Sequence, residues 1–147
     1  MPNTQELYQE LILDHYKNPR NSRKLDAATH HAHGNNPLCG DKVDIHLRIT
    51  DGAITDVSFE GAGCAISQAT ASLLTEALEN KSSDEAESLY INVMEMLTAK
   101  EECNTEKLGD LAALASVRDF PMRVKCATLP WQTLKAALDN KMEITTE

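Results

Sequence analysis

The chain has 147 residues, 41% of them hydrophobic, which suits a single globular domain spanning 1–147 and leaves little material for a second core. Its formal net charge of −9 argues against nucleic acid and anionic membranes as partners, because both favour a positively charged surface. With no secretory signal at the N-terminus and no apolar run near the ~18 residues of a membrane span, we expect a cytoplasmic protein.

The first predicted element is a helix over residues 4–17, where apolar side chains recur at helical spacing. Asn18-Pro19 ends it, because proline cannot continue a helix. The following stretch, from Arg20 to Leu38, has no periodicity and collects histidine, asparagine, glycine and proline. This composition predicts an irregular loop.

A β-hairpin is predicted next. From Val43 to Thr50, apolar and polar residues alternate, as they do in a half-buried strand. Asp51-Gly52 is a strong signal for a two-residue hairpin turn. The run from Ile54 to Phe59 is predicted to be the second strand, with a bulge where its alternation breaks.

The second half of the chain is predicted to be helical. Ser82 and Glu85 form a capping box before the second of its helices, and Phe120-Pro121 is expected to break the chain before the last. The expected helices cover residues 65–79, 84–98, a short segment capped by Asp110, and a segment that opens at Leu129. Strands early and helices late predict an α+β fold, with helices covering one face of a small antiparallel sheet. Trp131 and Phe120 are expected to anchor the core.

Three of the four cysteines are expected at breaks between elements. Cys39 precedes the first clear strand, Cys64 lies at a strand-to-helix junction, and Cys126 lies between Pro121 and the last helix. In a reducing compartment such cysteines are thiols or metal ligands rather than disulfides. A helix N-terminus behind Cys64 would favour its thiolate. A single cysteine is most often a small buried hydrophobe, however, and there is no Cys-x-x-Cys pair. Composition and spacing therefore leave a shared metal site and separate buried thiols equally open.

Three motifs closely resemble the IscU/NifU N-terminal family of iron–sulfur cluster assembly proteins, in order and over nearly the whole chain. They are Asn36-Pro37-Leu38-Cys39-Gly40-Asp41, the stretch from Phe59 to Ser72 with Gly61-Ala62-Gly63-Cys64, and the stretch from Arg118 to Trp131 with Lys125-Cys126-Ala127. The resemblance implies a SufE/NifU-like α+β fold and a cysteine desulfurase as partner. It also implies one metal site made by Cys39, Asp41, Cys64 and Cys126.

One position departs from the iron–sulfur scaffolds of this family. Those scaffolds carry histidine immediately before the third cysteine, where this chain has Lys125. The stretch between the second and third cysteines also looks longer, and both features match the SufU-type branch. Members of that branch bind zinc and receive sulfur from a SufS-type desulfurase.

The resemblance therefore implies a zinc-bound protein with sulfurtransferase-like activity. Cys39 is assigned as the acceptor of persulfide sulfur because its loop is the most irregular of the three. Arg123 and Lys125 are expected to offset the negative charge of the site. The alternative function is a scaffold that holds a [2Fe–2S] cluster or iron and works with cluster-assembly or acceptor proteins. A third possible function is that of a zinc-stabilised binding module without sulfur chemistry.

Other polar features are expected to stay outside the site. His30, His31 and His33 are interpreted as part of a flexible polar loop rather than as native ligands. Cys103 is expected not to be a ligand, because neighbouring carboxylates disfavour its thiolate. Between residues 76 and 106, nine acidic residues stand against two lysines, a balance of −7, which is typical of a solvated helix face.

Overall fold

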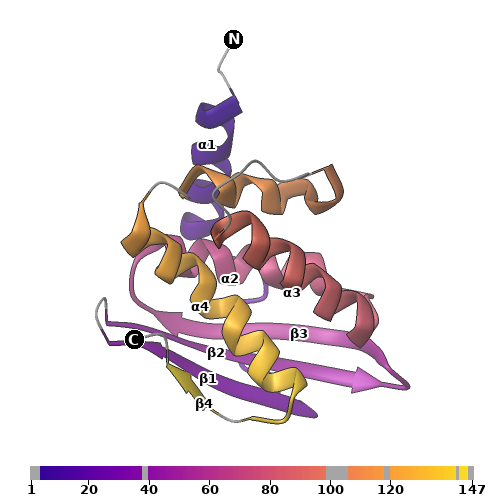
Figure 1. Cartoon of the computed structure of the whole chain (residues 1–147). Helices are drawn as coiled ribbons and strands as arrows, with labels where there is room; N and C mark the ends of the chain where they lie inside the picture. The colour runs from indigo at the N-terminus through magenta and orange to yellow at the C-terminus, as the bar shows by residue number, and fades with distance from the viewer. Residues whose placement is uncertain (1–3, 38–39, 99–105, 118–119, 142, 146–147) are drawn as a thin grey trace.

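A four-stranded sheet lies beneath a layer of helices, all on the same side of it (Figure 1). The computed structural model describes residues 4–37, 40–98, 106–117, 120–141 and 143–145. The strand order is β3-β2-β1-β4, with β1 (His30–Asn36), β2 (Asp41–Thr50) and β3 (Ala53–Ala62) antiparallel. The short β4 (Glu143–Thr145) adds to the free edge of β1 in parallel. The predicted α+β fold, with helices on one face of a small antiparallel sheet, is confirmed.

The hairpin between β2 and β3 forms where it was predicted. Asp51 and Gly52 have φ of 52° and 78°, the left-handed conformations that a type I′ turn needs at both central residues. The predicted bulge is also present, because the pairing register shifts between Arg48 and Ile49.

The prediction of an irregular loop from Arg20 to Leu38 was wrong for residues 30–36, which form β1. The residues of β1 that face the helices are small or polar: Ala32, Gly34 and Asn36 are all buried. A Cβ at Gly34 would overlap the hydroxyl of Thr133, so glycine is what allows the last helix to pack this closely. The strand forms through pairing and close packing, and it lacks the apolar alternation that would reveal it.

Within the described residues, five helical segments complete the fold. They are α1 (Thr4–Lys17), α2 (Ala65–Leu78), α3 (Ser83–Thr98), the 3₁₀ segment η1 (Glu106–Val117) and α4 (Pro121–Leu138). The capping box at α3 is confirmed: the Glu85 N–H donates to Ser82 Oγ at 3.0 Å, and the Ser82 N–H donates to Glu85 Oε1 at 3.2 Å. Segment η1 begins before Asp110 and is kinked at Gly109. Within the described ranges, no helix is both long and apolar enough to cross a bilayer.

Helix α4 is longer than predicted, and this moves Cys126 from a loop into a helix. Pro121 occupies the first turn, where its missing N–H costs no helical hydrogen bond and its fixed φ favours helix initiation. Phe120-Pro121 therefore starts the helix instead of separating two elements. Pro130 lies inside α4 and cannot donate a hydrogen bond to the carbonyl of Cys126, four residues earlier.

The core lies between the inner face of the sheet and the helices. Trp131 is fully buried there, as predicted, but Phe120 is 47% exposed and is not a core residue. The largest buried apolar side chains come from β2, β3, α2, α3, η1 and α4, and include Ile45, Leu47, Phe59, Leu74, Met96, Leu111 and Leu134.

The acidic residues of α3 lie mostly in solvent, as predicted. Asp84, Glu85 and Glu95 are exposed. Glu87 is partly buried and forms an ion pair with Lys135 of α4, which ties α3 to its neighbour.

Candidate metal centre

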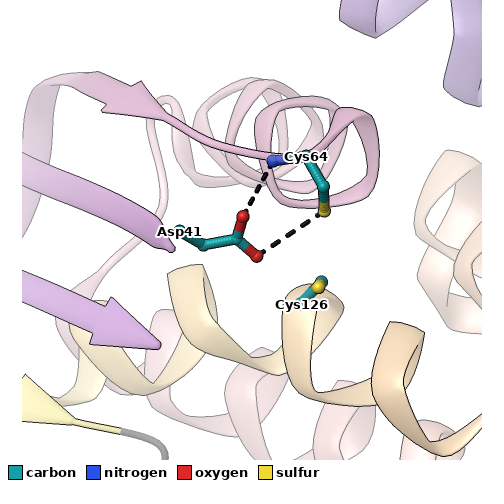
Figure 2. A group of neighbouring side chains, drawn as sticks. All are labelled: Asp41, Cys64 and Cys126. Atoms are coloured by element: carbon teal, nitrogen blue, oxygen red, sulfur yellow. Dashed lines mark hydrogen bonds between the residues drawn. The ribbon is translucent and has the colours of Figure 1, made fainter. Parts of the chain in front are cut away.

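Three of the residues singled out from the sequence come together at one point of the fold. One oxygen of Asp41 and the sulfur atoms of Cys64 and Cys126 all lie within 4.8 Å of one another (Figure 2). They come from the start of β2, the junction of β3 with α2, and the second turn of α4. Across the described residues, no other group of three or more histidine, cysteine, aspartate or glutamate donors is this compact.

Asp41 is the fully buried member of the group. Its Oδ1 accepts a hydrogen bond from the Cys64 N–H at 2.8 Å, and the Cys64 thiol donates to its Oδ2 at 3.6 Å. Gly63 allows the Asp41 carboxylate to lie this close to the backbone before Cys64. Its φ is +135°, and a Cβ there would overlap the Asp41 carboxylate and lie 2.8 Å from its Cα.

Cys64 is the N-cap of α2, which confirms the expected helix N-terminus behind it. Its backbone is extended, with φ −73° and ψ 161°, and its sulfur accepts the Ser67 N–H at 3.5 Å. The partial positive charge of a helix N-terminus favours a thiolate over a thiol. Because Cys64 is also partly exposed, this sulfur is the solvent-facing member of the group.

Cys126 is buried, with 4% of its surface exposed. Burial, followed by the nearby Asp41 and Cys64, raises the pKa of its thiol well above the ordinary value. If Asp41, Cys64 and Cys126 were all ionised, they would place a formal charge of −3 in a small, largely buried volume. A divalent cation is the natural partner of such a group, because it neutralises the charge and binds the thiolates directly.

The donor set fits zinc. Zinc takes cysteine sulfur and carboxylate oxygen in a four-coordinate tetrahedral arrangement, and the three described donors leave one position for a further ligand. Thiolates also hold iron–sulfur clusters, so the donors alone do not select between the two. Cys39, the fourth predicted ligand, lies outside the described residues. Its neighbour Gly40 has a φ of +72° and leads directly into Asp41.

The two basic residues predicted to support the site are placed differently from each other. Lys125 is half-buried on α4, next to Cys126. Arg123 is exposed, and its guanidinium lies 4.8 Å from the centre of the Phe120 ring, in a cation–π contact. That Arg123 and Lys125 offset the negative charge of the site stays a prediction.

An apolar hollow that was not predicted from the sequence lies beside the metal centre. Its volume is about 300 Å³, and Leu13, Tyr16 and Phe120, which line it, are 48%, 45% and 47% exposed. Ala65, which follows Cys64, also lines it, together with Gln9, Ile12, Ile66, Val117 and Arg123. A signal was present: Leu13 and Tyr16 are three residues apart on α1, as neighbours on one helix face are.

Comparison with known proteins places these features in a family. The family described as the NifU-like N-terminal domain matches residues 7–127. A relative from Bacillus subtilis, named zinc-dependent sulfurtransferase SufU, is 41% identical over 133 residues, which cover 90% of each chain. The iron–sulfur cluster assembly scaffold protein IscU of Thermotoga maritima is 39% identical over 132 residues, covering 90% of this chain and 92% of the relative.

Solved structures show the same architecture. A proposed iron–sulfur cluster assembly scaffold for the SUF system, from Fervidobacterium islandicum, superposes with a TM-score of 0.84 at 36% identity, covering 92% of this chain and 99% of the other. A nitrogen-fixing NifU-like N-terminal protein from Brucella abortus has a TM-score of 0.83 at 23% identity, a likeness of fold alone.

Proposed function

Since this chain belongs to the family of NifU-like N-terminal domains, which serves iron–sulfur cluster assembly, we propose that it is a zinc-bound acceptor of persulfide sulfur from a SufS-type cysteine desulfurase. The observation that carries the proposal is the convergence of Asp41, Cys64 and Cys126 within 4.8 Å. The zinc-dependent sulfurtransferase from Bacillus subtilis, similar over nine-tenths of the chain, supports the choice of metal and reaction.

Four residues would hold the zinc: Cys39, Asp41, Cys64 and Cys126. When bound, zinc keeps cysteine ligands ionised near neutral pH. The protein contributes the positions of the donors. The Cys64 N–H fixes the Asp41 carboxylate, and the close approach at Gly63 keeps it against the β3–α2 junction. The N-terminus of α2 stabilises negative charge on the Cys64 sulfur.

In the proposed transfer, the thiolate of Cys39 attacks the terminal sulfur of the desulfurase persulfide. The sulfur–sulfur bond of the donor breaks, the desulfurase cysteine leaves as a thiolate, and Cys39 carries the new persulfide. No oxidant or reductant is needed, because one sulfur–sulfur bond replaces another. Asp41 cannot carry sulfur, so its part is confined to holding the metal and its surroundings.

The apolar hollow supports a partner surface next to the site. Exposed Leu13, Tyr16 and Phe120 offer apolar area that a docked protein would remove from water. Because Ala65 lines the hollow and follows Cys64 directly, a desulfurase seated there would bring its persulfide close to the metal centre.

The second candidate function is a scaffold for a [2Fe–2S] cluster. Two cysteines beside an aspartate also suit iron, and the relative from Thermotoga maritima is named a scaffold. Lys125 in the position before Cys126 favours the sulfur acceptor, by resemblance to the zinc-binding branch.

Metal analysis together with a desulfurase assay tests the proposal. Protein purified in air should be colourless, contain one zinc per chain and stimulate a SufS-type desulfurase. Brown protein with iron and acid-labile sulfide would favour the scaffold instead. Zinc-bound protein that fails to stimulate the desulfurase would leave only a zinc-stabilised binding module.

Mapping of the persulfide tests the acceptor. The protein is incubated with desulfurase and cysteine, and modified peptides are identified by mass spectrometry without reductant. We expect persulfide on Cys39, loss of stimulation in Cys39→Ser, and wild-type behaviour in the control Cys103→Ser. Persulfide that accumulates on Cys103 or Cys126 while Cys39 stays unmodified would refute the mechanism.

A further inference from the structure

The solvent face of the sheet carries a cluster of imidazoles and carboxylates that the proposed function does not use. On β1, Ala32 and Gly34 are buried towards the helices, so His31 and His33 face the other way. On β2, the core positions are Val43, Ile45 and Leu47, which places Asp44 and His46 on that same outer face. Instead of the predicted flexible loop, these histidines lie on paired strands.

The pairing register arranges four of these side chains in a compact block. His31 lies opposite His46, and His33 lies opposite Asp44. One oxygen of Asp44, Oδ1, is 3.1 Å from His31 Nε2 and 3.2 Å from His33 Nδ1. The rings of His31 and His46 are stacked, with centroids 4.7 Å apart and planes 9° from parallel.

We propose that His31, His33 and Asp44 form a second metal site, for a transition metal ion of the zinc or nickel class. Imidazole nitrogen and carboxylate oxygen are donors that such ions accept. Two histidines separated by one residue on a strand point to the same face, which is what binding to a single ion requires.

The distances in the block support this assignment. Neighbouring donors around a tetrahedral zinc with bonds of about 2.0–2.1 Å lie about 3.3 Å apart. The two nitrogen–oxygen distances at Asp44, 3.1 and 3.2 Å, are already close to that value. The remaining distance, between the nitrogens of His31 and His33, is longer, so the three donors do not all lie within 4.8 Å of one another.

Binding therefore requires one exposed ring to turn about its side-chain bonds. His31 and His33 have 39% and 36% of their side-chain surface exposed, so such a rotation meets little resistance. His46 is better held: it is 9% exposed, and its Nε2 lies 3.2 Å from Glu60 Oε1 on β3. The His46 ring therefore stays in place beside the site, stacked on His31. Because a ring must move before the ion can bind, we expect micromolar rather than nanomolar affinity.

The test is a zinc titration of the full-length chain whose cysteine centre has first been saturated with zinc. Isothermal titration calorimetry should detect one further equivalent per chain. NMR of the histidine ring nitrogens should show changes at His31 and His33. His33→Ala should weaken this second binding by about tenfold or more, as should Asp44→Asn.

His30→Ala is the matched control, because His30 belongs to the same histidine run but lies on the opposite side of β1. It should leave the second binding unchanged, and each variant should keep its first zinc and its circular dichroism spectrum. Absence of a second equivalent, or equal weakening by His30→Ala and His33→Ala, would overturn the proposal. Neither result bears on the cysteine centre, whose zinc is counted separately.

Discussion

At the scale of single residues, the metal centre depends on how closely the backbone passes the Asp41 side chain. Gly63 has φ +135°, a conformation that side chains rarely tolerate, and it lies directly against the carboxylate. The family motif around Cys64 therefore has a physical reason for glycine at this position. Gly63, which directly precedes the proposed ligand Cys64, therefore helps to set the position of the proposed ligand Asp41.

Gly63→Ala should damage both the fold and the metal centre. The strained backbone should cost about 1–3 kcal/mol, and displacement of Asp41 should lower the bound zinc per chain. Thermal unfolding and metal analysis measure the two effects. Gly52→Ala is the control: Gly52 also has a positive φ of +78°, but a Cβ there meets nothing within 4 Å. It should cost about 1–2 kcal/mol and leave the zinc content intact. Equal zinc content in both variants would contradict this account of Gly63.

His15 should make the fold sensitive to acid. Its side chain is 1% exposed, Nδ1 lies 2.7 Å from Ser72 Oγ, and burial, followed by the charge of Arg20, lowers its pKa below the ordinary 6.5. The unfolded chain therefore binds this proton more readily than the folded chain. The folded state should lose stability as pH falls from about 6.5 towards the lower folded pKa, and lose no more below it.

Urea unfolding between pH 8 and pH 5 measures this effect. His15→Gln lacks the titrating ring, so its stability should decline less over this range than that of the wild type. His30→Gln is the control, because it removes a histidine of the sheet that takes no part in the buried contact with Ser72, and it should follow the wild type. A decline in His15→Gln as steep as in the wild type would rule out His15 as the source.

At the scale of elements, the contact between β1 and α4 holds the sheet against the helices. Gly34 of β1 faces Thr133 and Leu129 of α4, with no room for a side chain. The Thr133 hydroxyl donates to the Leu129 carbonyl at 2.7 Å, so it occupies a defined position in the helix. This contact also sets the distance of α4, and with it Cys126, from the strand that leads towards Asp41.

Gly34→Ala should destabilise the protein by about 1–3 kcal/mol, because the added methyl overlaps the Thr133 hydroxyl. The loss should be smaller in a Thr133→Ala background, where the obstructing atom is absent. Urea unfolding of the two single variants and the double variant measures the coupling. Asn35→Ala, on the opposite side of β1, should cost less. Strictly additive losses would show that the overlap is not the cause.

At the scale of the whole molecule, the metal centre joins three distant parts of the chain. Asp41 begins β2, Cys64 caps the N-terminus of α2, and Cys126 lies in α4. A metal ion bound there links the sheet to two helices and stabilises the folded state, because the unfolded chain cannot offer the donors together.

Removal of the metal should therefore lower the melting temperature, by about 5 °C or more. Differential scanning calorimetry before and after treatment with a chelator measures the change, with metal loss verified by elemental analysis. Cys64→Ala should melt near the temperature of the metal-free wild type and should not respond to the chelator. An unchanged melting curve after verified metal loss would exclude a structural role for the metal.

The sequence by itself determined the elements that local forces specify. Helix α1 has the predicted bounds, the Asp51-Gly52 turn forms the predicted hairpin, and Ser82 with Glu85 caps α3. Helical periodicity, strand alternation, turn conformation and capping bonds all act between residues close in the chain, so each leaves a readable pattern. The α+β class followed from the order of these elements, and the four proposed ligands came from resemblance to a family.

Only the tertiary structure decided which distant residues meet. Strand β1 was missed because its inward residues are Ala32, Gly34 and Asn36, and it is stabilised by pairing with β2 and contact with α4. Cys126 was expected in a loop because Phe120-Pro121 was interpreted as a break and the last helix was predicted to open at Leu129, yet Pro121 starts α4 and the helix continues through Pro130. The convergence of Asp41, Cys64 and Cys126 depends on the packing of β1 against its neighbours and on the extension of α4 back to Pro121. Packing between distant segments leaves no periodic signal in the sequence, so this convergence could not be predicted from local patterns.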